Sequence, residues 1–255
     1  MARIFITGST EGLGRAAALS LIEGGHEVVL HARSRERASA LADLAPKAGG
    51  IVVGDLARAA ETRSVAEQVN ALGRMDAIIH NAGVYSLPAR GETPEGHATT
   101  FAVNTLAPYL LTALIERPDR LVYLSSGLHR GGAGSLDDLD WTRRRWDGSR
   151  AYAESKLQVV ALALAVARRW PEVLSNAVDP GWVRTRMGGA SAPVDLATGQ
   201  RTQSWLAAAD EPAARTSGGY WHNLRRQAPE AEAADSEFQD KLLDRLAEIT
   251  GSRLP

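Results

Sequence analysis

Short apolar runs alternate with longer stretches of helical periodicity along most of the chain. The apolar runs lie at residues 3–7, 27–33, 51–53, 77–80, 121–124 and 174–178. Continuous apolar runs of this length are typical of parallel strands that are buried on both faces. We therefore predict an α/β fold, a doubly wound parallel sheet with helices on both faces. Helices are expected at residues 15–22, 59–72, 151–169 and 238–249, and a final strand at residues 219–221.

The length, charge and cysteine content limit the class of protein. A chain of 255 residues can form one domain with a sizeable core, so we expect a single domain over residues 1–255. The net charge of −1 gives no electrostatic reason for a nucleic-acid partner. With no cysteine there is no disulfide framework and no thiolate metal site, and the histidines lack metal-ligand spacing.

No segment of the sequence predicts targeting or membrane insertion. The first strand is expected from residue 3, and the longest apolar stretches, such as 159–167, are too short to cross a bilayer. We therefore expect a cytoplasmic protein with no membrane partner and no metal. A homo-oligomer is compatible with the sequence but is not predicted by it.

A glycine-rich turn follows the first apolar run. Gly8, Gly12 and Gly14 lie between the expected strand at 3–7 and the helix at 15–22. Glycines allow a tight turn and a close approach of the backbone to a pyrophosphate, whose charge then meets the N-terminus of the helix. Their spacing differs from the commoner Gly-x-Gly-x-x-Gly, so the flanking strand and helix support the prediction of a dinucleotide site.

The end of the second strand bears on which dinucleotide would bind. An NAD site usually has an acidic residue about 20 residues beyond the glycines, to hold the ribose 2′-hydroxyl. This chain has Arg33 there, followed by Arg35 and Arg37. A guanidinium matches a 2′-phosphate, which favours NADP(H) over NAD(H). Arg35 and Arg37 could instead solvate the start of a helix, and the carboxylate of Glu11 in the glycine turn would oppose a phosphate.

A tyrosine and a lysine lie four residues apart in the expected helix at 151–169. Residues at this spacing share a helix face, so Tyr152 and Lys156 point into the same space. The chain has only three lysines against twenty-six arginines, which makes an ammonium at this position notable. A nearby positive charge favours the phenolate and lowers a phenol pKa of about 10, which suits a general acid or base.

Together these motifs resemble the short-chain dehydrogenase/reductase family over about residues 3–183. The resemblance implies a Rossmann-type domain and a hydride transfer between a nicotinamide and a carbonyl or alcohol carbon. Besides the glycine turn and the Tyr152/Lys156 pair, it depends on Asp55 and Leu56, on Asn81, Ala82 and Gly83, on Asn104 and Ser126, and on Pro180, Gly181, Val183 and Thr185.

The resemblance also implies roles for individual residues. Tyr152 would exchange the substrate proton, and Ser126, rather than its neighbour Ser125, would bind the carbonyl oxygen. Lys156 would hold the nicotinamide ribose and lower the Tyr152 pKa, and Asn104 would hold a water that links Lys156 to solvent. Asp55 could otherwise be a helix cap, and Asn81 a turn residue. The implied cofactor contacts are Gly8, Ser9, Thr10, Gly12, Leu13, Gly14, Arg33, Asp55, Leu56, Asn81, Ala82, Gly83, Tyr152, Lys156, Pro180, Gly181, Val183 and Thr185.

One departure from the family pattern indicates a subfamily. Most members have about a dozen residues between this serine and the tyrosine, whereas Ser126 and Tyr152 are 26 residues apart. The inserted segment at about 127–150 resembles the branch of retinol dehydrogenases and protochlorophyllide reductases. Within it, residues 143–145 are three arginines, which we interpret as a solvated loop rather than a binding site.

The insertion at 127–150 and the segment at about 182–210 are the expected substrate loops, because ligands bind beyond the carboxyl ends of parallel strands. The chain has six tryptophans but only three phenylalanines, which hints at a bulky or aromatic substrate. Ordinary packing of the loops is the alternative. The tryptophans in or beside these loops are Trp141, Trp146, Trp182 and Trp205.

The leading functional hypothesis is an NADPH-dependent carbonyl reductase or alcohol dehydrogenase that acts on a small-molecule carbonyl or alcohol substrate. Two alternatives stay open. One is a non-catalytic NADP(H)-binding regulatory protein, which loss of the tyrosine or lysine would have favoured. The other is reduction of a C=C bond, as in the protochlorophyllide branch. The sequence does not identify the substrate.

Overall fold

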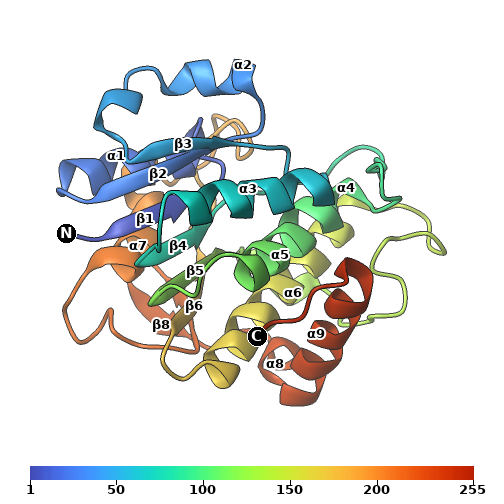
Figure 1. The fold of residues 1–255 in the computed structure, drawn as a ribbon. Helices are drawn as coiled ribbons and strands as arrows, with labels where there is room; N and C mark the ends of the chain where they lie inside the picture. The colour runs from blue at the N-terminus through green and yellow to red at the C-terminus, as the bar shows by residue number, and fades with distance from the viewer.

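The computed structural model describes residues 1–255, and its strands form one eight-stranded sheet in the order β3-β2-β1-β4-β5-β6-β7-β8 (Figure 1). Strands β1 to β7 run parallel, and β8 pairs antiparallel with β7 at the edge. The predicted parallel sheet is confirmed, and only β8 was not expected. The strands are β1 (Arg3–Ile6), β2 (Glu27–Ala32), β3 (Gly50–Val53), β4 (Ala77–His80), β5 (Arg120–Leu124), β6 (Leu174–Asp179), β7 (Gly219–His222) and β8 (Arg225–Gln227).

The helices cover both faces of the sheet. On one face α1 packs against α7, and on the other α3 packs against α5 while α6 lies on β5 and β6 with α9 outside it (Figure 1). The four helices predicted from periodicity correspond to α1, α3, α6 and α9. The helices are α1 (Gly12–Glu23), α2 (Arg35–Ala38), α3 (Ala59–Ala71), α4 (Thr99–Phe101), α5 (Ala107–Leu114), α6 (Gly148–Arg169), α7 (Leu196–Ala208), α8 (Ala231–Ala234) and α9 (Ser236–Thr250).

Each face of the sheet has its own hydrophobic core. Along β1, Ile4 and Ile6 are fully buried under α1 and α7, while Phe5 is fully buried on the face covered by α3, α5 and α6. Successive side chains of a strand point to opposite faces, so an unbroken apolar run fits a strand covered on both sides. No helix combines the length and the apolar composition that a membrane span requires.

The parallel arrangement brings the predicted motifs to one edge of the sheet. The glycine turn follows β1, Arg33 follows β2, Asp55 follows β3, Asn81 follows β4 and Ser126 follows β5. Pro180 and Gly181 follow β6 in the same way. The carboxyl ends of parallel strands form the crevice in which open α/β sheets bind ligands.

Candidate active site

The glycine turn has a backbone that only small residues allow. Gly8 and Gly12 have positive φ angles of 68° and 59°, which favour glycine. A Cβ atom on Gly14 would lie 2.3 Å from the Gly8 carbonyl oxygen and 2.4 Å from Asn81 Nδ2. The N-cap residue of α1, Glu11, makes no side-chain capping bond. The free amide groups at this helix end and the close-packed glycines fit a bound pyrophosphate.

Asn81 and Thr7 fasten this turn to β4. The Asn81 side chain donates from Nδ2 to the Thr7 carbonyl oxygen at 2.9 Å, and the backbone amides of Asn81 and Ala82 donate to Thr7 Oγ1. Ser9 is fully buried, and its hydroxyl donates to the Ile6 carbonyl oxygen. The side chain of Ser9 therefore stabilises the turn from inside, so a cofactor contact at Ser9 would have to involve the backbone.

The arginines after β2 divide into two kinds. Arg37 forms a 3.0 Å ion pair with Glu11, which offsets the carboxylate that the sequence places in the glycine turn. Arg37 thus lies in α2, as the alternative drawn from the sequence had it, but pairs with a carboxylate as well as with solvent. Arg33 and Arg35 are exposed and form no ion pair within the protein. They remain available for an anion at this edge of the sheet.

Asp55 lies in a tight turn between β3 and α3. Its carboxylate accepts from the amide of Ala57 at 3.0 Å, and its own amide donates to Glu61 Oε2 at 2.7 Å. Since α3 begins at Ala59, Asp55 is not its N-cap. Leu56 is buried at 6% exposure.

Tyr152 lies in the second turn of α6 and Lys156 in the third. Both side chains are buried, with exposures of 6% and 4%. The Lys156 ammonium donates to the Leu124 carbonyl oxygen at 2.8 Å and lies 5.6 Å from the centroid of the Tyr152 ring. Burial lowers the pKa of Lys156 to about 8. The predicted juxtaposition of phenol and ammonium is thus present at the carboxyl end of β5.

The pKa of Tyr152 departs from the expected direction. Burial raises it to about 12, the nearby Ser126 hydroxyl works in the lowering direction, and the charge of Asp179 works in the raising direction. The net pKa of Tyr152 is therefore not lowered as expected, because desolvation of the phenolate is the largest effect in this structure. At neutral pH the phenol therefore keeps its proton and is a donor.

The two serines after β5 have different environments. Ser126 is partly exposed, and its hydroxyl accepts from the amide of Leu128 at 3.2 Å and lies near enough to the Tyr152 phenol to lower its pKa. Ser125 is 3% exposed and donates to the Lys156 carbonyl oxygen at 2.9 Å. Only Ser126 is therefore free to face a substrate together with Tyr152.

Asn104 lies in a π-helical turn, Ala102–Leu106, which the sequence did not predict. Pro108 has no amide hydrogen for the carbonyl four residues before it, at Asn104, and the turn widens so that the Ala107 amide donates to the Ala102 carbonyl oxygen. The Asn104 side chain donates from Nδ2 to the Val84 carbonyl oxygen and to Ser155 Oγ. Its amide oxygen accepts from the Val84 amide at 2.9 Å.

Gly83 brings Asn104 close to Lys156. A Cβ atom on Gly83 would lie 3.3 Å from Asn104 Oδ1 and 3.4 Å from Lys156 Nζ. The two side chains thus flank the same glycine. However, both hydrogens of Asn104 Nδ2 are already donated, to the Val84 carbonyl oxygen and to Ser155 Oγ. A water near Lys156 would therefore have to bind to another group.

The loop after β6 lies against the glycine turn. Gly181 has a φ of 81°, and its amide donates to Asp179 Oδ1 at 2.8 Å. A Cβ atom on Gly12 would lie 3.6 Å from Thr185 Cγ2, which places Thr185 beside the N-terminus of α1. Val183 is buried and forms a bridge with Val194 that closes the loop. These contacts place Thr185 where it could reach a ligand of the glycine turn.

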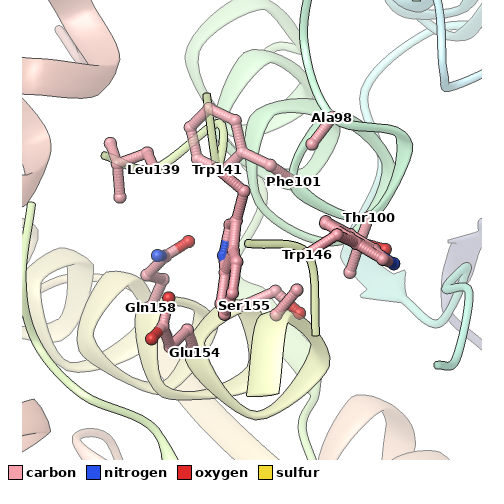
Figure 2. A pocket seen from close by; sticks show the side chains of 10 residues that line it. Ala98, Thr100, Phe101, Leu139, Trp141, Trp146, Glu154, Ser155 and Gln158 are labelled. Atoms are coloured by element: carbon pink, nitrogen blue, oxygen red, sulfur yellow. The ribbon is translucent and has the colours of Figure 1, made fainter. Parts of the chain in front are cut away.

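The tryptophans of the insertion pack inward. Trp141 is 6% exposed, and its ring lies edge-to-face with that of Trp146 at 5.7 Å. Trp146 Nε1 donates to the Leu87 carbonyl oxygen at 3.0 Å. Figure 2 shows both rings in a small pocket that Phe101 and Ser155 also line. Ordinary packing, one of the two interpretations drawn from the sequence, accounts for both rings.

Arg144 fastens the insertion to α6. Its guanidinium binds both carboxylate oxygens of Glu154 at 2.9 Å, contacts Asp138 at 3.2 Å and lies 3.9 Å from the ring centroid of Trp141. The Glu154 side chain is only 3% exposed. The interpretation of residues 143–145 as a solvated loop is therefore wrong for Arg144, whereas Arg143 and Arg145 are exposed.

Several residues near the site carried no recognised signal in the sequence. The Tyr85 ring lies edge-to-face with Tyr152 at 4.7 Å and is 41% exposed. Leu128 and Met187 are exposed by 51% and 48%, and Trp182, which the sequence did single out, is exposed by 57%. An apolar residue shortly after Asn81-Ala82-Gly83 or after Ser126 would have been the signal, since loops at this edge face the crevice.

The fold and the strand-end motifs define a dinucleotide-binding oxidoreductase of the Rossmann type. A family model described as "Enoyl-(Acyl carrier protein) reductase" matches residues 8–212. The chain belongs to the short-chain dehydrogenase/reductase family and is one of its oxidoreductases.

Relatives of similar length support this membership. The chain is 40% identical to the short-chain dehydrogenase chry4 of Gibberella zeae, over 100% of this chain and 99% of that protein. It is 34% identical to the provisionally named daunorubicin C-13 ketoreductase DnrU of Streptomyces, over 97% and 92%. It is 31% identical to human retinol dehydrogenase 13, over 99% and 85%. The predicted resemblance to the retinol dehydrogenase branch is thus confirmed.

Solved structures show the same fold. An uncharacterised protein from Mycobacterium paratuberculosis superimposes with a TM-score of 0.85 at 25% identity, over 100% of this chain and 95% of that one. Carbonyl reductase Sniffer of Drosophila melanogaster superimposes with a TM-score of 0.67 at 23% identity, over 88% and 97%. The latter likeness is evidence for the fold alone.

Proposed function

We propose that the protein is an NADP(H)-dependent reductase that transfers a hydride to the carbonyl carbon of a bulky or aromatic ketone or aldehyde. The observation that carries the proposal is the buried Tyr152 phenol, which lies beside the Lys156 ammonium and close enough to the Ser126 hydroxyl for that hydroxyl to lower its pKa. This group lies at the same sheet edge as the glycine turn. A protonated phenol and a hydroxyl can together bind and protonate the oxygen of a carbonyl.

Each residue of the group has a role in this proposal. Ser126 holds the carbonyl oxygen, and Tyr152 donates the proton that this oxygen takes up. Lys156 lies where it can bind ribose hydroxyls and stabilise the phenolate that Tyr152 becomes. Asn104 fixes the loop at Val84 and so positions Gly83 beside Lys156. The bound nicotinamide supplies the hydride, and the residues of this chain orient the substrate and deliver the proton.

The arginines favour NADP(H). Arg33 and Arg35 have no carboxylate partner within the protein, whereas Arg37 is held by Glu11. A 2′-phosphate carries nearly two negative charges, so two free guanidinium groups at the end of β2 would bind it better than a 2′-hydroxyl. The ion pair of Arg37 reduces the repulsion that Glu11 alone would exert.

The exposed apolar side chains support a bulky substrate. Tyr85, Leu128, Trp182 and Met187 follow β4, β5 and β6, and each exposes at least 41% of its surface. Trp141 and Trp146 pack inward, and Trp205 packs edge-to-face on Trp221 at 5.3 Å against the core under α7, so Trp182 is the one of the four tryptophans that remains for substrate binding. The Trp182 indole is fixed by a 2.8 Å bond from Nε1 to the Gly188 carbonyl oxygen, so its ring face is preorganised.

A second candidate is reduction of a C=C bond. The description of the matched family model names an enoyl reductase, while relatives at 34% and 31% identity are named as a ketoreductase and a retinol dehydrogenase. Both reactions need a hydride and a proton at adjacent positions. The Tyr152–Ser126 pair favours the carbonyl reaction, because two neighbouring hydroxyls can both bind a carbonyl oxygen.

The test is consumption of NADPH by the purified protein with aromatic ketones, aldehydes and conjugated enones, followed by identification of the product. We expect alcohols from the carbonyl substrates, and Tyr152→Phe should reduce kcat by at least a hundredfold while NADPH still binds. Tyr109→Phe is the control, since it removes another buried tyrosine hydroxyl, which donates to Ser252, outside the site. Saturated ketones as products would support the C=C reductase. No turnover with NADPH bound would support the non-catalytic regulatory protein.

A further inference from the structure

His31 lies on β2 beneath the glycine turn and has no part in the mechanism above. It is 2% exposed, and its ring lies edge-on to Phe5. The Gly8 amide donates to His31 Nδ1 at 2.9 Å, and His31 Nε2 lies 2.9 Å from the Gly54 carbonyl oxygen. One imidazole thus connects the turn after β1 to the turn after β3.

These contacts fix the form of the ring. An amide can only donate, so Nδ1 must be the acceptor, and the single hydrogen of the neutral ring must then be on Nε2, which donates to Gly54. The backbone of His31 adds two bonds to the same turn, because its amide donates to Ser9 Oγ and its carbonyl oxygen accepts from the Ser9 amide, both at 3.1 Å. Burial lowers the His31 pKa, which keeps this neutral form.

The position of the bridge relates it to dinucleotide binding. Gly8 has a positive φ and precedes the amides at the start of α1, and Gly54 precedes Asp55. In the proposed function the first turn would hold the pyrophosphate, and the second leads to Asp55, one of the implied cofactor contacts. The imidazole therefore sets the spacing between two backbone segments that one bound dinucleotide would contact together.

We infer that His31 is a positioning residue for the cofactor: its imidazole holds the Gly8 and Gly54 turns at the separation that the dinucleotide requires. This inference rests on the proposed function. Without the bridge, both turns would have to be ordered by the ligand, and the free energy of ordering would reduce affinity. The rate of hydride transfer would change little, because His31 touches none of the catalytic group.

The experiment compares His31→Leu with His80→Leu. His80 is the matched control, since it is also 2% exposed, lies on β4 of the same sheet, and contacts Tyr123 and Thr112 instead of the glycine turn. For His31→Leu we expect the KM and the Kd for NADPH to rise about tenfold with kcat within twofold, because two buried polar groups lose their partner. For His80→Leu we expect lower stability with an unchanged KM.

A conservative variant separates positioning from folding. In His31→Asn the side-chain oxygen can accept from Gly8 but cannot reach Gly54, so we expect an intermediate KM. Equal KM values for wild type, His31→Leu and His31→Asn would overturn the inference while leaving the proposed function intact. Failure of the wild type to bind NADPH, measured by fluorescence titration, would instead refute the proposed function. If His31→Leu does not fold, the KM of His31→Asn decides.

Discussion

Replacement of Lys156 by methionine should stabilise the protein while it removes activity. The ammonium is 4% exposed, and burial lowers its pKa from 10.5 to about 8. A difference of this size corresponds to about 3 kcal/mol that the folded state loses by holding the charge. Methionine has a similar length and no charge, so it should recover most of this free energy.

The hydrogen bond that Lys156 makes reduces the expected gain. Lys156→Met leaves the Leu124 carbonyl oxygen without the 2.8 Å bond from Nζ, which costs about 1 kcal/mol. The net increase in the free energy of unfolding at pH 7 is then about 2 kcal/mol, or about 4 to 8 °C in Tm for a chain of this size. Activity should be lost, because the partner of Tyr152 is gone.

The pH dependence provides a sharper test of the cause. Because the folded-state pKa is lowered, the destabilisation of the wild type is complete below pH 8 and disappears as pH rises to 10.5, where both states are neutral. Urea unfolding should therefore show a stability difference between Lys156→Met and wild type at pH 7 that shrinks towards pH 10.5. Lys241→Met is the control, since Lys241 is exposed on α9 and should differ by less than about 0.5 kcal/mol. A variant no more stable than wild type at pH 7, or a difference independent of pH, would refute this reasoning.

Two further predictions concern arginines. Arg33→Ala should raise the KM for NADPH by about tenfold and leave the KM for NADH within twofold, as measured in parallel initial-rate assays; equal effects on both would argue against a 2′-phosphate contact. Arg144→Met should lower the free energy of unfolding by about 3 kcal/mol, because it leaves the Glu154 carboxylate buried with only the exposed Arg150 nearby. In the double variant with Glu154→Gln, denaturant unfolding should show that part of the lost free energy of unfolding is regained. A double variant no more stable than Arg144→Met would contradict a role for the buried charge.

The parts of the fold that the sequence predicted are those determined by local pattern. The strands at 77–80 and 174–178 are apolar runs between polar segments, and β4 and β6 agree with them within one residue. The helix at 151–169 extends back to Gly148 because Asp147 caps it by accepting from the Arg150 amide. Pattern alone does not locate a cap when several polar residues precede the helix.

The elements that were missed depend on contacts distant in sequence. Arg225–Gln227 has no apolar alternation, and it is a strand because it pairs with β7 at the sheet edge. α7 contains Gly199, and its Gln203 is fully buried, so its sequence lacks a clear apolar face. Gly199 is required there because a Cβ atom would lie 2.6 Å from Val183.

The sequence predicted which residues form the candidate site, but not the side-chain contacts that hold the surrounding segments in place. Tyr152 and Lys156 share a helix face by spacing alone, and the strand ends bring Asn81 and Ser126 to one edge by topology. Arg144 donates to Glu154, which lies ten residues further along the chain on α6. The sequence offers several carboxylates near Arg144, and packing determines which of them becomes its partner. The same holds for His31, whose partners come from two other strand ends.

The titration order of Tyr152 and Lys156 connects the geometry to the pH dependence of the proposed reaction. Spacing alone suggests an ammonium that lowers the phenol pKa, but both groups are buried, and burial disfavours the charged form of each. Lys156, with a pKa of about 8, loses its proton before Tyr152, with a pKa of about 12. At neutral pH the pair is therefore a neutral phenol beside an ammonium, which is the state that donates a proton to a carbonyl oxygen. The reverse reaction would start from the phenolate, so the same pair serves both directions, and oxidation should gain rate relative to reduction as the pH rises.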